Sequence, residues 1–168
     1  ADNWLHPRHL EALVRHQRRT GAEVVSSRRT FCRWEDGSPM PIDVDPTHEA
    51  VTVDTGCHLF TRAAFRFQPL WSLMPRPFTP VGSRLVWNAL VESGVRVAFN
   101  GAPTLHFRSQ YAFHYLALGE DPPDLAKTGE WDEAAKALHL EQEPELRVLL
   151  AGHFPGAADV REARWRCP

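Results

Sequence analysis

The side chains that could do chemistry in this 168-residue chain are spread over four short segments. The first is Asp2-Asn3-Trp4-Leu5-His6-Pro7, and the second is Val53-Asp54-Thr55-Gly56-Cys57-His58. The third is Val81-Gly82-Ser83-Arg84, and the fourth runs from Pro103-Thr104 to Tyr111-Ala112-Phe113-His114-Tyr115. Their carboxylates, hydroxyls, guanidinium and imidazole are groups that hold cations, contact anions and move protons. A function built on them requires a fold that brings distant parts of the chain together.

Other reactive residues predict no site of their own. His9 and His16 lie two helical turns apart on one face, and His6 is close by, but no cysteine or acidic residue completes a tetrahedral zinc set. We therefore expect all three to be surface histidines. Cys57 has no evident base next to it, so a nucleophilic role is not expected.

Composition sets the class of protein. Apolar residues make up 43% and charged residues 24% of the chain, which is typical of a single globular domain. The formal net charge of −2 argues against a general polyanion binder, and no nucleic-acid partner is expected. No apolar run reaches the roughly 18 residues that a membrane span needs. The three cysteines are unclustered, which predicts reduced thiols in a cytoplasmic protein.

The first part of the chain predicts a helix followed by strands. Pro7 suits a first helical turn, and Leu10, Leu13, Val14 and Gln17 follow helical spacing up to Gly21. Residues 22–26 and 30–34 are expected to be two separate strands, with a hairpin turn at 35–38.

The middle and last parts predict further alternation. Short strands are expected at 50–53, 58–62, 96–99 and 103–107, and helical segments at 63–67, 83–93 and 111–118. Residues 68–80, rich in proline, are expected to be irregular, with Trp71 and Trp87 as core aromatics rather than sugar platforms. After Lys127 the chain predicts acidic amphipathic helices. Alternating strands and helices indicate an α/β layered domain at 1–127, followed by a helical C-terminal extension at 128–168.

In their order along the chain, the four segments resemble the second half of a family-2 glycosyltransferase with the GT-A fold. The resemblance covers about residues 1–127, and its evidence is the ordered set of four rather than any one motif. It implies a partial Rossmann-like mixed sheet flanked by helices. It also implies transfer of a sugar from a nucleotide-sugar donor to a hydroxyl acceptor, with inversion and with Mn²⁺ or Mg²⁺.

The resemblance assigns roles to individual residues. Asp2 is identified with the last carboxylate of a metal-binding Asp-x-Asp motif, and His114 with a late histidine near the metal or diphosphate. Asp54 and Ser83 are the catalytic candidates. The implied substrate-binding residues are Asn3, Trp4, Thr55, Gly56, Cys57 and Arg84. Gly56 would permit close backbone approach, and Thr55 and Cys57 are small enough to leave room for a sugar. His114 has a second reading, as a hydrogen-bonded and partly buried structural histidine.

Two departures from the family pattern leave the mechanism open. Many relatives have an aspartate general base where Ser83 stands, and a serine without a partner base cannot take a proton at neutral pH. The alignment is displaced, or the base is elsewhere, as at Asp54, or this copy is catalytically weak. The nucleotide-binding strands and the first carboxylate of the metal motif are also missing, so this chain alone is expected to bind nucleotide-sugars poorly. The alternative function is a catalytically inactive GT-A-like binding or interaction module, and a chance match within an unrelated α/β protein is the third reading.

Overall fold

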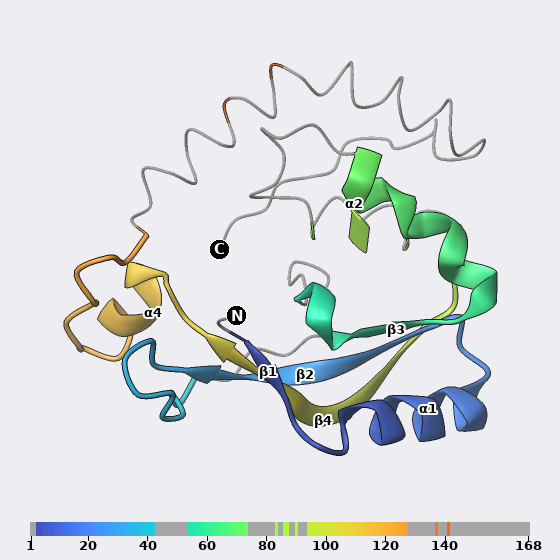
Figure 1. Cartoon of the computed structure of the whole chain (residues 1–168), viewed down its shortest axis with the longest axis horizontal. Coiled ribbons are helices and arrows are strands. Elements are labelled where there is room, and N and C mark those ends of the chain that lie inside the picture. Colours follow the sequence, from blue (N-terminus) through green and yellow to red (C-terminus); the bar gives the residue numbers. More distant parts are fainter. Residues whose placement is uncertain are drawn as a thin grey trace.

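The computed structural model describes residues 3–42, 54–73, 83, 86, 87, 90, 94–127, 137 and 141. Within them the chain forms a curled, four-stranded mixed sheet (Figure 1). The strands in order across the sheet are β1 (Trp4–Leu5), β4 (Val97–Arg108), β2 (Val24–Cys32) and β3 (His58–Phe60). The two central strands β4 and β2 are parallel, and each edge strand is antiparallel to its neighbour. The predicted α/β class with a mixed sheet is therefore confirmed.

The helical elements lie on both sides of this sheet. They are α1 (His9–Thr20), η1 (Thr55–Cys57), η2 (Arg62–Phe67), α2 (Pro69–Leu73) and α4 (Ala112–Leu116), where η marks a 3-10 helix. Figure 1 shows α1 on one face and η1, η2 and α2 on the other. The helical turn predicted near 63–67 is confirmed, as is a helix within 111–118. The prediction of irregular structure for 68–73 was wrong, because Pro69 begins a helix, a position that proline tolerates.

Helix α1 forms where its sequence predicts, but its buried face is rotated. Gly21 ends the helix with φ +65°, and its N–H bonds to the Gln17 carbonyl. Leu13 is fully buried against Ala22 and Val25, whereas Leu10 is 63% exposed. Leu10, which shares the helical spacing of Leu13, is therefore not part of the buried face. The sheet contacts the stripe that carries His9 and Leu13, four residues apart, and Leu10 lies to one side of it.

The two central strands are longer than predicted. The segments expected as separate strands at 22–26 and 30–34 form the single strand β2, and those at 96–99 and 103–107 form β4. Their register shifts between Ser26 and Arg28, where the β4 partner moves from Phe99 to Pro103. The additional residues of β4 include Gly101 at φ +72°. Unequal lengths of paired backbone bend a sheet, which explains its curl.

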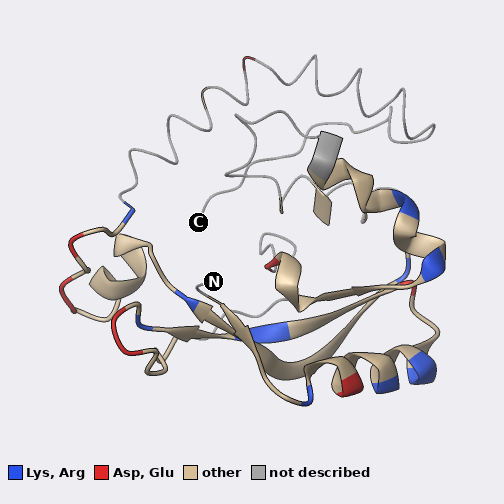
Figure 2. Ribbon diagram, in the orientation of Figure 1, with Lys and Arg blue, Asp and Glu red and all other residues tan. Residues whose placement is uncertain are grey.

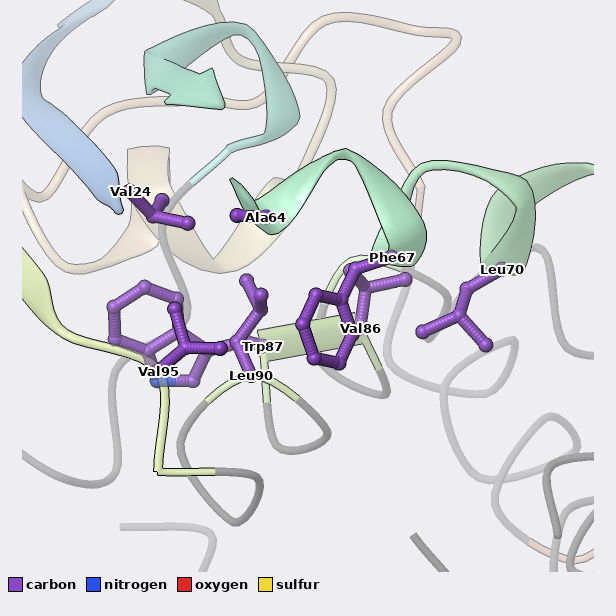
Figure 3. Close-up of a cluster of buried hydrophobic side chains, with 8 residues drawn as sticks. All are labelled: Val24, Ala64, Phe67, Leu70, Val86, Trp87, Leu90 and Val95. Atoms are coloured by element: carbon purple, nitrogen blue, oxygen red, sulfur yellow. The ribbon is translucent and has the colours of Figure 1, made fainter. Parts of the chain in front are cut away.

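The largest hydrophobic cluster lies between β2, β4 and the helices opposite α1 (Figure 3). Its buried members are Val24, Ala64, Phe67, Leu70, Val86, Trp87, Leu90 and Val95. Trp87 is 7% exposed, and Trp71 packs against the cluster. Both tryptophans are core aromatics, as predicted. Ser83, Val86, Trp87 and Leu90 are all helical, in agreement with the predicted helix there.

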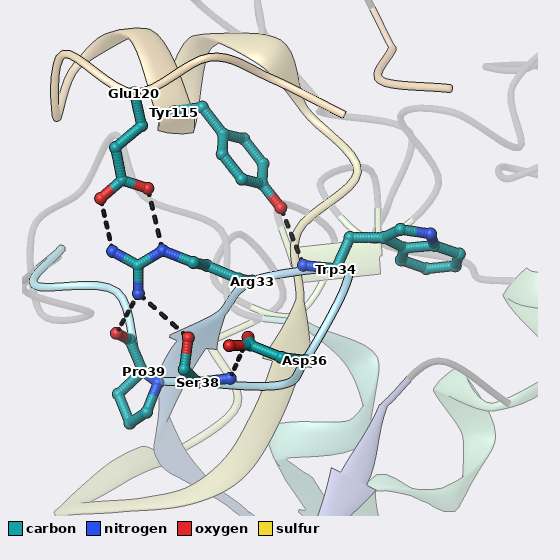
Figure 4. Close-up of polar contacts among 7 residues, drawn as sticks. All are labelled: Arg33, Trp34, Asp36, Ser38, Pro39, Tyr115 and Glu120. Atoms are coloured by element: carbon teal, nitrogen blue, oxygen red, sulfur yellow. Dashed lines mark hydrogen bonds and ion pairs between the residues drawn. The ribbon is translucent and has the colours of Figure 1, made fainter. Parts of the chain in front are cut away.

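A polar network closes the far end of β2 onto α4 (Figure 4). Arg33 forms an ion pair with Glu120 and also donates to the Pro39 carbonyl at 2.8 Å. The Tyr115 hydroxyl accepts the Trp34 N–H at 2.8 Å. The turn predicted at 35–38 is confirmed by the bond from the Arg33 N–H to the Ser38 carbonyl at 2.8 Å. These contacts fix α4 against β2, although the two are far apart along the chain.

Several predictions fall on residues outside the described ranges. They are the strand at 50–53, the segment at 74–80, most of the helix at 83–93 and almost all of the C-terminal extension, in which Ala137 and Glu141 are helical. In the described part of the chain, no helix is both long and apolar enough to cross a bilayer.

The rotated face of α1 predicts unequal effects of two leucine truncations. Leu13→Ala removes a fully buried side chain and is expected to lower the free energy of unfolding by about 2–5 kcal/mol. Leu10→Ala, the matched control in the same helix, is expected to change it by less than about 0.5 kcal/mol. Urea unfolding followed by circular dichroism measures both. Equal losses in the two variants would show that α1 buries a different face.

His58 predicts loss of stability in mild acid. Its ring stacks on Trp87 at 5.6 Å, its Nδ1 has no partner among the described residues, and burial lowers its pKa from 6.5 to about 4. Between pH 6.5 and pH 4, His58 is therefore protonated in the unfolded chain but not in the folded chain. The free energy of unfolding falls as the pH falls through this window. The loss from this one group is at most about 3 kcal/mol.

The variant His58→Phe keeps an aromatic ring against Trp87 and removes the titrating group. Chemical unfolding of both proteins at pH 7 and pH 4 is expected to show a smaller loss for the variant. An identical pH dependence for both proteins would show that His58 does not titrate with a lowered pKa.

Candidate functional site

The site begins at a tight turn that we call the site loop, residues 54–57. The Asp54 carboxylate caps it, since Oδ1 accepts the Gly56 N–H at 2.8 Å, and the Cys57 N–H donates to the Asp54 carbonyl at 2.9 Å. This is the capping arrangement that aspartate favours before a helical turn. One carboxylate oxygen of Asp54 is thus used to hold the loop, and the side chain stays partly exposed.

Packing, rather than a positive φ, accounts for the glycine in this loop. A Cβ on Gly56 would lie 3.1 Å from Asp54 Oδ1 and 3.2 Å from Leu105 Cδ1. Cys57 is fully buried beside Leu105, and burial raises the pKa of its thiol to about 12. Thr55 and Gly56 are therefore the parts of the loop exposed to a ligand, while Cys57 anchors the loop to β4.

Ser83 comes from a different segment and lies against the loop. Its Oγ is 3.2 Å from Thr55 Oγ1, although the two residues are 28 apart in sequence. The contact joins two hydroxyl groups, neither of which can take a proton at neutral pH. The structure thus brings the second and third sequence segments together. Arg84 lies outside the described residues.

His9 supports the same region from the helix side. It is 3% exposed, and its Nδ1 lies 2.7 Å from Thr104 Oγ1 on β4. Burial lowers the pKa of His9, and hydrogen bonds at the backbone of Thr104 and Gly56 oppose that shift. The prediction of a surface histidine was wrong here. The available signal was the four-residue spacing of His9 and Leu13 on the face that contacts the sheet.

His114 is held in a defined orientation beside β2. Its Nδ1 is 2.6 Å from Ser109 Oγ, and its ring meets Phe31 edge-on at 4.6 Å between centroids. Burial, followed by the charge of Arg29, lowers its pKa to about 4. His114 is therefore a neutral imidazole at pH 7, and its structural role agrees with the hydrogen-bonded, partly buried reading. Only Nε2 remains for a ligand, since Nδ1 is engaged.

Arg29 is the residue that sequence reasoning missed. It is one of two adjacent arginines of β2, and the arginines of that strand colour part of it blue in Figure 2. The Arg29 guanidinium carbon lies 4.6 Å from the Phe31 ring centre and 5.0 Å from that of Phe107. Burial lowers the pKa of Arg29, and the electrostatic effects of Cys57, Asp54 and Tyr111 partly oppose this shift. Its charge also acts on His114. Arg29 pairs with Leu105, which packs on Cys57, and it shares the Phe31 ring with His114, so it lies between the site loop and α4.

The first segment forms the edge strand β1 and contacts β4. Asn3 Oδ1 accepts the Arg108 N–H at 3.1 Å, and the 39% exposed Trp4 ring stacks on His106 at 4.9 Å. Successive residues of a strand point to opposite faces, so this stack lies on the face opposite to Leu105 and Phe107. The structure therefore separates Trp4 from the face that carries Arg29. Asp2 lies outside the described residues.

Among the described residues, no group of three or more His, Cys, Asp or Glu side chains could hold a metal ion. Comparisons with protein-family models, curated proteins and solved structures found no significant match. The geometry of the site thus stands without a relative to interpret it.

Burial of the site loop predicts an unreactive thiol. Cys57 is fully buried with a pKa of about 12, so iodoacetamide at pH 8 is expected to leave it unmodified in the native protein and to label it after unfolding. Cys32 is also fully buried with a raised pKa and is expected to behave alike. Peptide mass spectrometry locates the label. Rapid native modification of Cys57 would show that the loop opens readily or lies elsewhere.

Proposed function

We propose that this chain is part of a nucleotide-sugar-dependent glycosyltransferase of the GT-A fold, which transfers a sugar to a hydroxyl acceptor with inversion. The observation that carries the proposal is the hydrogen bond between Thr55 and Ser83, two hydroxyls from separate segments of the predicted site. Arg29 adds support, because it shares the Phe31 ring with His114 and pairs across the sheet with Leu105, which packs on the site loop. Two of the four segments thus meet at the site loop, and Arg29 links that loop to the fourth.

Asp54 is the general base in this proposal. Its Oδ1 is occupied by the Gly56 N–H, which orients the carboxylate, and no described residue donates to its second oxygen. In the proposed step, the acceptor oxygen forms a bond to the anomeric carbon as the bond from that carbon to the diphosphate breaks. Asp54 takes the proton of the acceptor hydroxyl. Ser83 does not compete for this role, because its partner is another hydroxyl.

Asp2 and His114 are the proposed holders of Mn²⁺ or Mg²⁺. The structure offers one test of this donor set: His114 is neutral at pH 7, so its ring can serve as a ligand. When bound, such an ion supplies positive charge that offsets the charge developing on the diphosphate.

The alternative is a binding or interaction module without turnover. The position of Ser83 favours it, because the hydroxyl bonded to Thr55 occupies the place at which relatives are expected to carry a carboxylate. Such a module would bind a saccharide or a protein partner, and it differs from the enzyme in lacking turnover.

The test uses the protein at its full natural length with Mn²⁺, a panel of nucleotide-sugars and mixed hydroxyl acceptors. Release of nucleoside diphosphate and mass spectrometry of the products measure transfer. Asp54→Asn keeps the oxygen that caps Gly56 and is expected to lower kcat by on the order of 10²–10⁴. Ser83→Ala is the control in the same site and is expected to leave kcat within about fivefold, since it removes only an uncharged hydroxyl pair.

Three results would count against these assignments. Unchanged kcat in Asp54→Asn would move the base elsewhere. Turnover that is absent in the wild type and appears in Ser83→Asp would favour the inactive module. Failure to transfer sugar from any donor, together with failure to bind any, would end the glycosyltransferase proposal.

A further inference from the structure

Several arginines in the described part of the chain are paired with carboxylates. Arg33 is paired with Glu120, Arg15 with Glu11, and Arg96 lies 4.0 Å from Glu23. Within the described residues, the Arg29 guanidinium donates no hydrogen bond and forms no ion pair, and the residue is partly buried beneath two aromatic rings. A charge removed from water without a counter-ion is unfavourable.

The two aromatic contacts compensate only in part. The faces of Phe31 and Phe107 attract the cation, but they accept none of the five N–H groups that a guanidinium carries. Their main effect is geometric, because contact with two rings from neighbouring strands holds the guanidinium in place. A fixed guanidinium with unused donors is arranged for two parallel hydrogen bonds to an oxyanion.

The neighbours of Arg29 leave its N–H donors unused. The His114 ring packs against the same Phe31 ring as Arg29, and its Nδ1 is engaged by Ser109 Oγ. Asp54 is near enough to act on Arg29, yet it forms no ion pair with it among the described contacts, and its Oδ1 is committed to Gly56. Arg29 pairs across the sheet with Leu105, which packs on Cys57 of the site loop, and it shares the Phe31 ring with His114.

We propose that Arg29 is the anchor of an oxyanion-binding site between the site loop and α4, and that its ligand is a phosphate group. Binding of an oxyanion by Arg29 does not require that the protein catalyse a reaction. The source of the phosphate, in contrast, rests on the proposed function. It belongs either to the diphosphate of the donor or to a phosphate on the acceptor. The ligand phosphate supplies the counter-charge that the described residues do not.

The test is calorimetric titration of the whole chain, without metal, with three probes: inorganic pyrophosphate, uridine diphosphate and glycerol 3-phosphate. Arg29→Met keeps an apolar side chain between the two rings and removes the donors. It is expected to weaken binding of the tightest probe about tenfold or more. Arg29→Lys keeps the charge without the fork and is expected to be intermediate. Arg15→Met removes the same charge from the exposed outer side of α1 and is expected to bind as the wild type does.

Thermal unfolding separates this proposal from a purely structural role. If Arg29 serves a ligand, Arg29→Met is expected to melt no lower than the wild type, because a desolvated charge is gone. The tightest probe is expected to raise the Tm of the wild type and not that of Arg29→Met. A variant that melts well below the wild type and still shows the same ligand-induced shift would assign Arg29 to stability alone.

The arms also identify the source of the phosphate. If uridine diphosphate displaces pyrophosphate, the phosphate at this site belongs to the donor. If glycerol 3-phosphate binds and uridine diphosphate does not displace it, the phosphate belongs to the acceptor. The proposal is overturned if the wild type binds none of the probes, or if Arg29→Met binds them equally well. Arg29-dependent binding without sugar transfer leaves this site standing and counts only against the enzyme. If Arg29→Met transfers sugar with the same KM for donor and acceptor as the wild type, the result counts only against this site.

Discussion

The parallel pairing of β2 with β4, and the register shift within it, is the constraint on which the rest of the structure depends. The β4 strand carries additional residues opposite Ser26 and Arg28, so the sheet curls there. Beyond the shift, Arg29 and Phe31 face the same side as Leu105 and Phe107. The site loop packs on that side through Cys57 and Leu105, whereas His9 reaches Thr104 from the other. If the register beyond the shift changed by one residue, Leu105 and Phe107 would point to the face opposite to that of Arg29 and Phe31.

The chemically suggestive residues divide into those that build the site and those that border it. Cys57, Gly56 and His9 are held by packing or by buried hydrogen bonds, and they set the position of the loop. Thr55, Ser83 and Asp54 remain partly or fully exposed at its surface. A rigid frame beneath a small exposed group is what orientation of a reacting hydroxyl requires. The buried histidine and thiol are therefore structural supports for the proposed chemistry.

Local signals in the sequence predicted several elements well. Gly21 after a helical stretch, the turn at 35–38 and the helical turn near 63–67 all depend on neighbouring residues, and all three are present. The same reasoning divided β2 at the three polar residues Ser27-Arg28-Arg29. That division hid Arg29, which needs a continuous strand to place it beside Phe31 and Phe107.

The sequence by itself determined the α/β class, the position of α1 and the existence of a small-residue loop after Asp54, because each follows from the periodicity or chain geometry of adjacent residues. Only the tertiary structure decided that His9 and Cys57 are buried, that Ser83 lies against Thr55 and that Arg29 lies between the site loop and His114. These relations join residues far apart along the chain. They depend on strand register and sheet curvature, which arise from how β2 and β4 pair and which no local pattern encodes.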